Sequence, residues 1–341
     1  NNDNRLDIVT ASWSSGASPK FFMRLDDGSF KESSIASGLE GVYGGLNIES
    51  GDYNNDGNLD LYILRGAWLE GAGDLPNSLL RNNGDGTFTD VTFKLGLADV
   101  NRPTQTAGWS DFDNDGDIDI YVSRGAWLWA QGKIPDSLLQ RQDDGTYLDV
   151  TFSSGLGREN YPSQAAAWAD FNNDGHLDLY VGNEHSQENN SIAERKGQVT
   201  GIVAPSKLFK NQGDGTFKGG FVGGSKNSLR APTMVAFADY DNDGDLDLLI
   251  GVAEETHFFR NTGSANAPAY TQEGGDEPFG IADVNPAASP AFADIDGDGD
   301  LDLVLDDISS RGLTYLENIG GGVDSLISVD YTFPSNSTSV D

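Results

Sequence analysis

The chain has 341 residues, a formal net charge of −33 and no cysteine, with 54 Asp and Glu against 21 scattered Lys and Arg. This balance argues against nucleic acid as a partner, because phosphate binding depends on clustered basic side chains, and no run of about 18 apolar residues is present that would insert into a membrane. Yet 37% of the residues are apolar and 6 Trp, 11 Tyr and 17 Phe are present, so the sequence indicates a globular core and not a disordered acidic chain.

A nine-residue pattern, D-x-[DN]-x-D-G-x-x-D, recurs along the chain. Residues 1–7 (NNDNRLD) fit it from the third position, which puts Asn1, Asp3 and Asp7 at positions 3, 5 and 9. Complete copies begin at Asp52, Asp111, Asp170, Asp239 and Asp294, separated by 59, 59, 69 and 55 residues. Such spacing is slightly above that of familiar four-stranded propeller blades.

The segments around each copy predict four strands per repeat. Small residues with one aromatic precede the copies (TAGWS, AAAWA, MVAFA), as in a strand near a central axis. A run that is apolar on both faces follows (LDLYIL, IDIYVS, LDLYVG), as in a strand between neighbouring sheets. A third apolar strand then leads into an Asp-Gly turn, a strong hairpin signal, and a fourth strand.

These elements predict an all-β fold, a β-propeller of four-stranded antiparallel blades. Six repeats are visible, and a seventh is expected in the complete protein. We expect residues 1–322 to form the propeller, with the first blade lacking its innermost strand. Residues 323–341 are expected to supply a closing strand, through LISVDYTF, and then a polar Ser/Thr-rich linker.

The repeated pattern is that of an oxygen-rich cation site. Positions 1, 3, 5 and 9 carry carboxylate or carboxamide oxygens, position 7 offers a backbone carbonyl, and the glycine at position 6 permits a sharp turn. This donor set suits Ca²⁺ better than Mg²⁺, so about five to six calcium ions are expected. The residue at position 12 is apolar, which excludes an EF-hand. The alternative is an ordinary Asp- and Asn-rich turn, but three or four carboxylates so close together repel without a cation.

The predicted metal ligands in the incomplete first copy are Asn1, Asp3 and Asp7. Those of the complete copies are Asp52, Asn54, Asp56, Asn58 and Asp60; Asp111, Asp113, Asp115, Asp117 and Asp119; Asp170, Asn172, Asp174, His176 and Asp178; Asp239, Asp241, Asp243, Asp245 and Asp247; and Asp294, Asp296, Asp298, Asp300 and Asp302. At position 7 the ligand is the backbone carbonyl, so the His176 imidazole is expected to be exposed. Asparagine in place of aspartate lowers the charge of three copies.

The repeats resemble the FG-GAP or VCBS-type repeats of calcium-binding propellers. Copies such as RNNGDGTFTDVTFKLGL are most similar to the cartilage acidic protein and UnbV-related group, and integrin α-subunit heads are more distant. The resemblance implies a propeller with calcium at positions 1, 3, 5 and 9, in a family made mostly of secreted binding and adhesion modules. The Phe-Gly and Gly-Ala-Pro sequences of the integrin type are absent, so integrin-like ligand binding is not implied.

Two consecutive repeats carry twin inserts, RGAWLEGAGDLPNSLL from Arg65 and RGAWLWAQGKIPDSLL from Arg124. Strand order puts these second-to-third connections on the face opposite the acidic loops. Their candidate ligand-binding residues are Arg65, Trp68, Arg124, Trp127 and Trp129, which suit a platform for sugar or for a protein partner. The alternative is that these tryptophans cap the blades.

Three functions remain open. The first hypothesis is a non-enzymatic, calcium-stabilised extracellular module, secreted or at the cell surface, for binding, adhesion or surface assembly. Its partners would be a protein or glycan at the cell surface or in the matrix, or further copies of itself. The second is a carbohydrate-binding propeller, and the third a polysaccharide-cleaving enzyme. We predict no catalytic residues, because no cluster of His, Tyr and Arg or of paired carboxylates is apparent outside the acidic pattern.

Overall fold

The computed structural model describes residues 3–12, 14, 16–66, 75–98, 102–126, 128, 132–158, 160–183, 206–221, 234–251, 256–264, 267–273, 291–307, 312–318 and 326–331. This part of the chain contains no helix with the length and hydropathy needed to cross a membrane. It consists of strands, turns and a single-turn 3₁₀ helix, η3 (Leu156–Arg158).

The described strands form six antiparallel sheets, which we call blades 1 to 6 in chain order. Blade 1 contains β1 (Ile8–Thr10), β2 (Lys20–Arg24) and β3 (Phe30–Glu32). Blade 2 contains β4 (Asn47–Gly51), β5 (Asp60–Leu64), β6 (Ser78–Asn82) and β7 (Phe88–Asp90); blade 3 β8 (Thr104–Ser110), β9 (Asp119–Arg124), β10 (Ser137–Arg141) and β11 (Tyr147–Asp149); blade 4 β12 (Ser163–Ala169), β13 (Asp178–Asn183), β14 (Lys207–Asn211) and β15 (Phe217–Phe221); blade 5 β16 (Met234–Ala238), β17 (Asp247–Gly251), β18 (Thr256–Asn261) and β19 (Tyr270–Glu273); blade 6 β20 (Ala291–Ala293), β21 (Asp302–Asp307), β22 (Gly312–Asn318) and β23 (Leu326–Tyr331).

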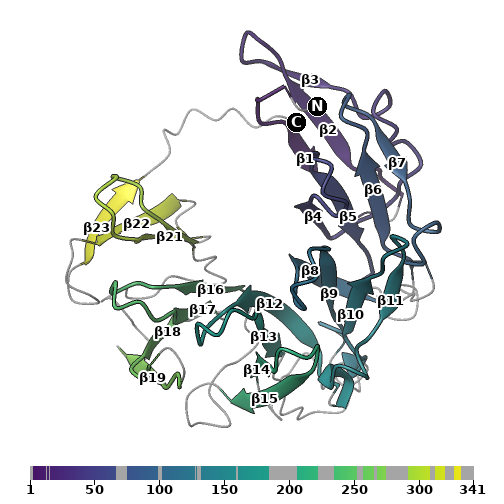
Figure 1. Ribbon diagram of the computed structural model, residues 1–341. Helices are drawn as coiled ribbons and strands as arrows, with labels where there is room; N and C mark the ends of the chain where they lie inside the picture. The colour runs from purple at the N-terminus through teal and green to yellow at the C-terminus, as the bar shows by residue number, and fades with distance from the viewer. Residues whose placement is uncertain are drawn as a thin grey trace, which may run out of the picture.

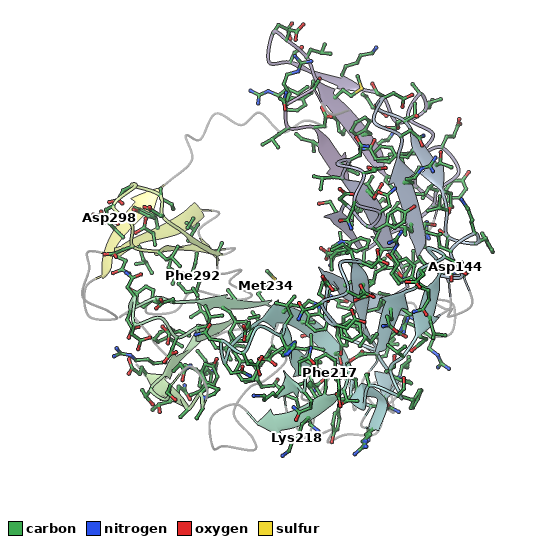
Figure 2. All side chains as sticks on the ribbon, in the orientation of Figure 1. Asp144, Phe217, Lys218, Met234, Phe292 and Asp298 are labelled. Carbon is green, nitrogen blue, oxygen red and sulfur yellow. The ribbon has the colours of Figure 1, made fainter. Side chains whose placement is uncertain are left out.

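The blades follow one another around a central axis, with the first strand of each four-stranded blade innermost (Figure 1). The inner strands β4, β8, β12, β16 and β20 contact one another in that order. Met234 and Phe292, on two inner strands, lie toward the centre, whereas Asp144 and Lys218 lie toward the rim (Figure 2). The predicted all-β propeller is therefore confirmed.

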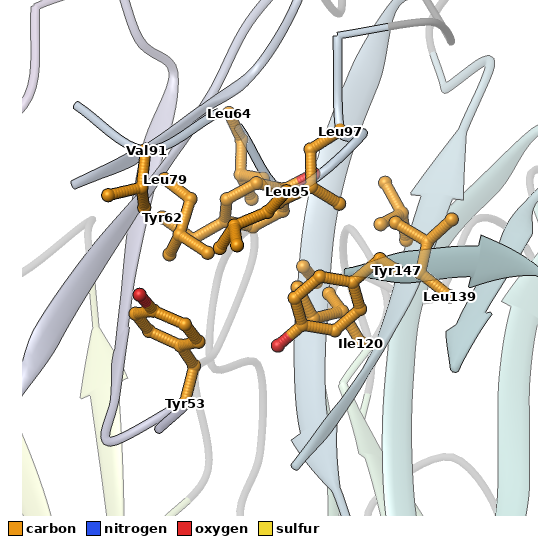
Figure 3. Close-up of a cluster of buried hydrophobic side chains, with 12 residues drawn as sticks. Tyr53, Tyr62, Leu64, Leu79, Val91, Leu95, Leu97, Ile120, Leu139 and Tyr147 are labelled. Carbon is orange, nitrogen blue, oxygen red and sulfur yellow. The ribbon is translucent and has the colours of Figure 1, made fainter. Parts of the chain in front are cut away.

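Apolar residues gather between blades and not within them. Between blades 2 and 3, Tyr62 and Leu79 belong to the same buried cluster as Ile120 and Leu139 (Figure 3). Equivalent clusters join blades 1 and 2, 3 and 4, and 4 and 5. Every residue of β5, β9, β13 and β17 is buried, because both faces of these second strands are covered by neighbouring blades. This explains their apolar character on both faces.

Two details refine the expected organisation. Blade 1 has three strands among the described residues, and β1 occupies the place that the second strand takes in the other blades. The segment expected to close the ring, residues 326–331, instead pairs with β22 as the fourth strand of blade 6. The propeller therefore extends past residue 322, to Tyr331 at least, because this strand satisfies the open edge of its own sheet.

Close packing at the axis requires small residues on the inner strands. A Cβ atom added to Gly51 would lie 2.9 Å from three ring atoms of Trp109 in the next blade, and one added to Gly108 would lie 3.2 Å from the ring of Trp168. Each ring therefore packs directly on the backbone of the preceding inner strand. This contact accounts for the small residues in these segments.

We predict that Gly51→Ala lowers the stability of the protein by about 1 to 3 kcal/mol, because the indole of Trp109 is held in a packed interface and cannot move freely. Gly16→Ala is the matched control, since a Cβ there meets nothing within 4 Å. Denaturant or thermal unfolding of both variants checks this. Equal stability of the two variants would contradict the packing described.

Candidate metal-binding loops

The acidic pattern forms the turn between the first and second strands of blades 2 to 6, as its position before the buried strand predicts. The turn needs left-handed backbone at two places. Asparagine at position 4 has φ between 51° and 59° in four copies, and glycine at position 6 has φ between 84° and 99° in the five complete copies. In blade 3 the two oxygens of Asp111 accept the N–H groups of Asp115, at 3.0 Å, and Gly116, at 3.1 Å. The position-1 carboxylate thus holds the loop closed.

Three loops bring a trio of carboxylates together. In blades 3, 5 and 6 the aspartates at positions 1, 3 and 5 each have an oxygen within 4.8 Å of the others. These trios are Asp111, Asp113 and Asp115; Asp239, Asp241 and Asp243; and Asp294, Asp296 and Asp298. Like charges at this separation repel one another, and three hard oxygens that converge are suitable ligands for a divalent cation.

The loops of blades 2 and 4 have asparagine at position 3 and are less acidic. The amide of Asn54 donates to Asp56 at 2.9 Å, and that of Asn172 donates to Asp178 at 3.2 Å. Hydrogen bonds within the loop therefore stabilise part of the carboxylate charge. These two loops therefore bring fewer carboxylates together than the three loops with an all-aspartate trio.

The aspartate at position 9 is buried and ties three segments together. In blade 2, Asp60 accepts the N–H of Tyr53 in the loop at 3.2 Å and that of Asn82 on the third strand at 2.7 Å. The same pair of bonds recurs at Asp119, Asp247 and Asp302. A carboxylate oxygen has two lone pairs, so these groups keep acceptor capacity for a metal.

Burial makes the charge of this aspartate unfavourable. It raises the pKa of Asp60 to about 6, of Asp178 and Asp247 to about 7, and of Asp119 to about 8. The backbone N–H donors lower each pKa, but by less than burial raises it. Without a cation, Asp119 therefore holds a proton at neutral pH and Asp178 and Asp247 are partly protonated, whereas Asp60 takes up its proton in mildly acidic solution.

In the first loop, a basic side chain forms an ion pair with one of the acidic residues. Arg5, at position 7, forms ion pairs with Asp3 and with Asp26. Asn4 stands where the complete copies have glycine and takes φ of 64°. Asp7 accepts the N–H of Arg24 at 2.8 Å, which matches the position-9 bond of the other blades. Asn1 lies outside the described residues.

Basic residues on the third strands also reach the loops, a feature that the sequence analysis missed. Arg141 forms an ion pair with Asp117, and Arg260 forms one with Asp241. The Nζ atom of Lys210 lies 3.1 Å from a carboxylate oxygen of Asp174. In blade 6 the residue next to the strand's final asparagine is Glu317. A basic residue recurs in the sequence at the end of the third strand, and this recurrence could have predicted the contacts with the loops. At this position of the third strand, blade 6 therefore has an acidic residue where blades 4 and 5 have a basic one.

Asparagine at position 4 links successive blades, a role that was also not predicted. The amides of Asn55, Asn114 and Asn173 each donate, at 3.0 Å, to the glycine carbonyl at position 6 of the next loop. The imidazole of His176 is half-buried rather than exposed, and its Nδ1 lies 3.0 Å from the Asn114 amide. The acidic loops therefore form a connected series on one face.

On the opposite face, two predicted ligand-binding residues lie in the interior. Arg65 is 7% exposed and donates to the carbonyls of Tyr43, at 2.7 Å, and Pro76, at 2.6 Å. Arg124 is 2% exposed and donates to Pro135 and Ser137. Both guanidinium groups fix the ends of the inserts. Trp68, Trp127 and Trp129 lie outside the described residues.

Comparison with known proteins identifies the repeats. An FG-GAP-like repeat family model matches residues 1–63 and 199–250. The chain is 25% identical to human cartilage acidic protein 1 over 304 residues, 83% of this chain and 40% of the relative, and 31% identical to the Xenopus tropicalis protein over 189 residues, 50% of this chain and 25% of the relative. It therefore spans at most about two fifths of the length of these relatives.

Among solved structures, an Agrocybe aegerita lectin that recognises non-reducing terminal N-acetylglucosamine has a similar fold. The TM-score is 0.52 at 13% identity, over 95% of this chain and 79% of the lectin. The six antiparallel blades and the recurring acidic loops identify the fold as a β-propeller, and the family match supports its similarity to propellers of FG-GAP-like repeats.

Proposed function

We propose that the protein is an extracellular binding module, without catalysis, whose propeller is stabilised by calcium. The observation that carries the proposal is the convergence of three carboxylates within 4.8 Å in blades 3, 5 and 6. A bound Ca²⁺ supplies the positive charge that offsets their repulsion and lets the buried position-9 aspartates ionise. About five to six ions would be bound, with the blade 2 and blade 4 sites weaker.

Calcium suits such a module because extracellular sites bind it with dissociation constants of about 10⁻⁴ to 10⁻³ M, near the concentration outside cells. Secretion or display at the cell surface follows from this chemistry. Similarity to cartilage acidic protein 1 also supports a matrix or surface partner. In this role the metal is structural, and recognition belongs to other surfaces of the ring.

We predict that chelating calcium lowers the melting temperature by about 10 °C or more. At 10 mM Ca²⁺, each site of the affinity given above contributes roughly 1.4 to 2.7 kcal/mol, and each kcal/mol shifts the melting temperature of a domain this large by about 2 °C. Differential scanning calorimetry with EGTA, then with excess Ca²⁺, measures the difference. A melting temperature that neither EGTA nor excess Ca²⁺ changes would rule out calcium stabilisation.

A single substitution sharpens this test. Asp296→Asn puts at position 3 of blade 6 the residue that blades 2 and 4 carry naturally, so the fold should tolerate it. We expect it to reduce the stabilisation by calcium by about 1 kcal/mol, through loss of one ligand charge. Asp144→Asn, in the exposed β10–β11 turn, is the control with the same change of charge. An equal loss in both variants would assign the effect to net charge alone.

The pKa shifts predict the pH dependence of the calcium-free protein. Above about pH 4 the folded chain holds protons that the unfolded chain has released, on Asp60 up to about pH 6, on Asp178 and Asp247 up to about pH 7 and on Asp119 up to about pH 8. Stability in EGTA should therefore fall as pH rises from 5.5 to 8.5, and saturating calcium should remove this trend. Melting curves of wild type and Asp119→Asn measure it. If the slope is the same in both, Asp119 is not among the titrating groups.

Glycan binding through the paired inserts is the second candidate. It is favoured by the buried arginines, Arg65 and Arg124, which anchor both inserts at equivalent places on the face opposite the acidic loops. A glycan array with wild type should then give a signal that Trp68→Ala, Trp127→Ala and Trp129→Ala each weaken by tenfold or more, about 1.4 kcal/mol. Binding that survives all three substitutions would rule out the tryptophan platform.

A further inference from the structure

Arg260, on β18, forms an ion pair with one carboxylate of the blade 5 trio. Its Nη2 atom contacts Oδ2 of Asp241, at position 3 of the acidic loop. The side chain of Asp241 is 8% exposed, and its other oxygen, Oδ1, is buried with no hydrogen-bond partner in the described part of the chain. A buried carboxylate oxygen without a partner is costly. Arg260 therefore satisfies only half of this carboxylate.

The blade 5 trio carries more negative charge than one arginine can offset. Asp239, Asp241 and Asp243 each have an oxygen within 4.8 Å of the others, and the guanidinium of Arg260 supplies a single positive charge. A divalent cation bound by the trio would share Asp241 with Arg260. Two positive charges repel strongly at such a short distance. Arg260 and a bound cation therefore compete for the same carboxylate.

A second carboxylate is available to Arg260 when it leaves Asp241. The Nη1 atom of Arg260 lies 3.9 Å from Oε1 of Glu273, on β19. The side chain of Arg260 is 38% exposed, so packing does not fix it, whereas the Asp241 side chain is buried. Rotation of the guanidinium toward Glu273 would exchange one ion pair for another. The strand thus provides two positions for the same charge.

Blade 3 has an uncharged residue at the equivalent place. Gln140 precedes the residue whose N–H binds the position-9 aspartate, as Arg260 does in blade 5. Its Nε2 atom donates to Asp113, at position 3 of the blade 3 loop, at 2.5 Å. Arg141 pairs with Asp117, which is outside the trio. Glutamine therefore makes the same contact with position 3 without a positive charge.

We propose that Arg260 is a built-in competitor of Ca²⁺ in blade 5: it pairs with Asp241 while no metal is bound and moves to Glu273 when Ca²⁺ binds. The inference rests on the calcium role proposed above and concerns the regulation of one of its sites. Arg260 keeps the blade 5 loop formed at low calcium, because it offsets part of the repulsion within the trio. The same charge lowers the affinity of the site for calcium.

The variant Arg260→Gln tests the proposal, because it copies the residue that blade 3 carries naturally. Amide exchange of residues 239–247, measured by mass spectrometry over a series of free Ca²⁺ concentrations, reports this site alone, and residues 111–119 serve as an internal reference. We expect the midpoint of calcium protection at residues 239–247 to fall about tenfold in the variant. The midpoint at residues 111–119 should not change.

Melting curves give a second measurement with opposite signs. In EGTA the Arg260→Gln variant should melt below wild type, because a buried carboxylate loses its ion pair. On addition of 10 mM Ca²⁺ it should gain about 3 °C more than wild type, the equivalent of a tenfold tighter site. Glu273→Gln should raise the midpoint at residues 239–247 about threefold in wild type, and by less in the Arg260→Gln background, where no arginine needs a new partner.

Arg81→Gln is the matched control for net charge. Arg81 occupies the same place on the third strand of blade 2, but its guanidinium donates to Asn83 in the exposed hairpin. An equal shift at residues 239–247 in both variants, or no shift in Arg260→Gln, would overturn the role of Arg260 and leave calcium binding intact. Calcium protection at none of the loops would overturn the proposed function as well. If Arg260→Gln does not fold, Gln140→Arg decides, since it should raise the midpoint at residues 111–119 about tenfold; an unchanged midpoint there would overturn the proposal.

Discussion

The buried aspartate at position 9 is the interaction on which each blade depends. Its two oxygens accept one N–H from the acidic loop and one from the third strand, as Asp60 does from Tyr53 and Asn82. A single side chain thus fixes the end of the inner strand, the start of the second strand and the end of the third. A buried carboxylate is costly unless a proton or a cation compensates its charge. The acidic loop beside it therefore has a structural reason to attract a metal ion.

The ring is held together by the contacts between blades. Apolar second strands pack against both neighbours, inner-strand rings cover the small residues of the preceding blade, and position-4 asparagines bond from loop to loop. Because these contacts repeat, each blade is positioned mainly by its neighbours.

Strand order separates two kinds of loop. The acidic turns and the Asp-Gly hairpins lie at one end of the strands, and the inserts anchored by Arg65 and Arg124 lie at the other. Under the proposed function the metal-bearing face gives rigidity, and the opposite face is free to vary for recognition. Buried arginines suit this division, because a guanidinium group has five donors that can bond several loop carbonyls at once.

The sequence by itself determined the blade architecture and the acidic loops, because both arise from short-range patterns: strand periodicity, Asp-Gly turns and oxygen donors at fixed offsets. Asparagine at position 4 recurs just as regularly, yet its bond to Gly116 or Gly175 joins residues about 60 positions apart and is visible only when the blades are side by side. The same holds for Arg65 and Arg124, which resemble surface ligands in the sequence but are buried, and for residues 326–331, which complete blade 6. Tertiary structure decided these points, because burial and strand partners depend on which distant segments come together.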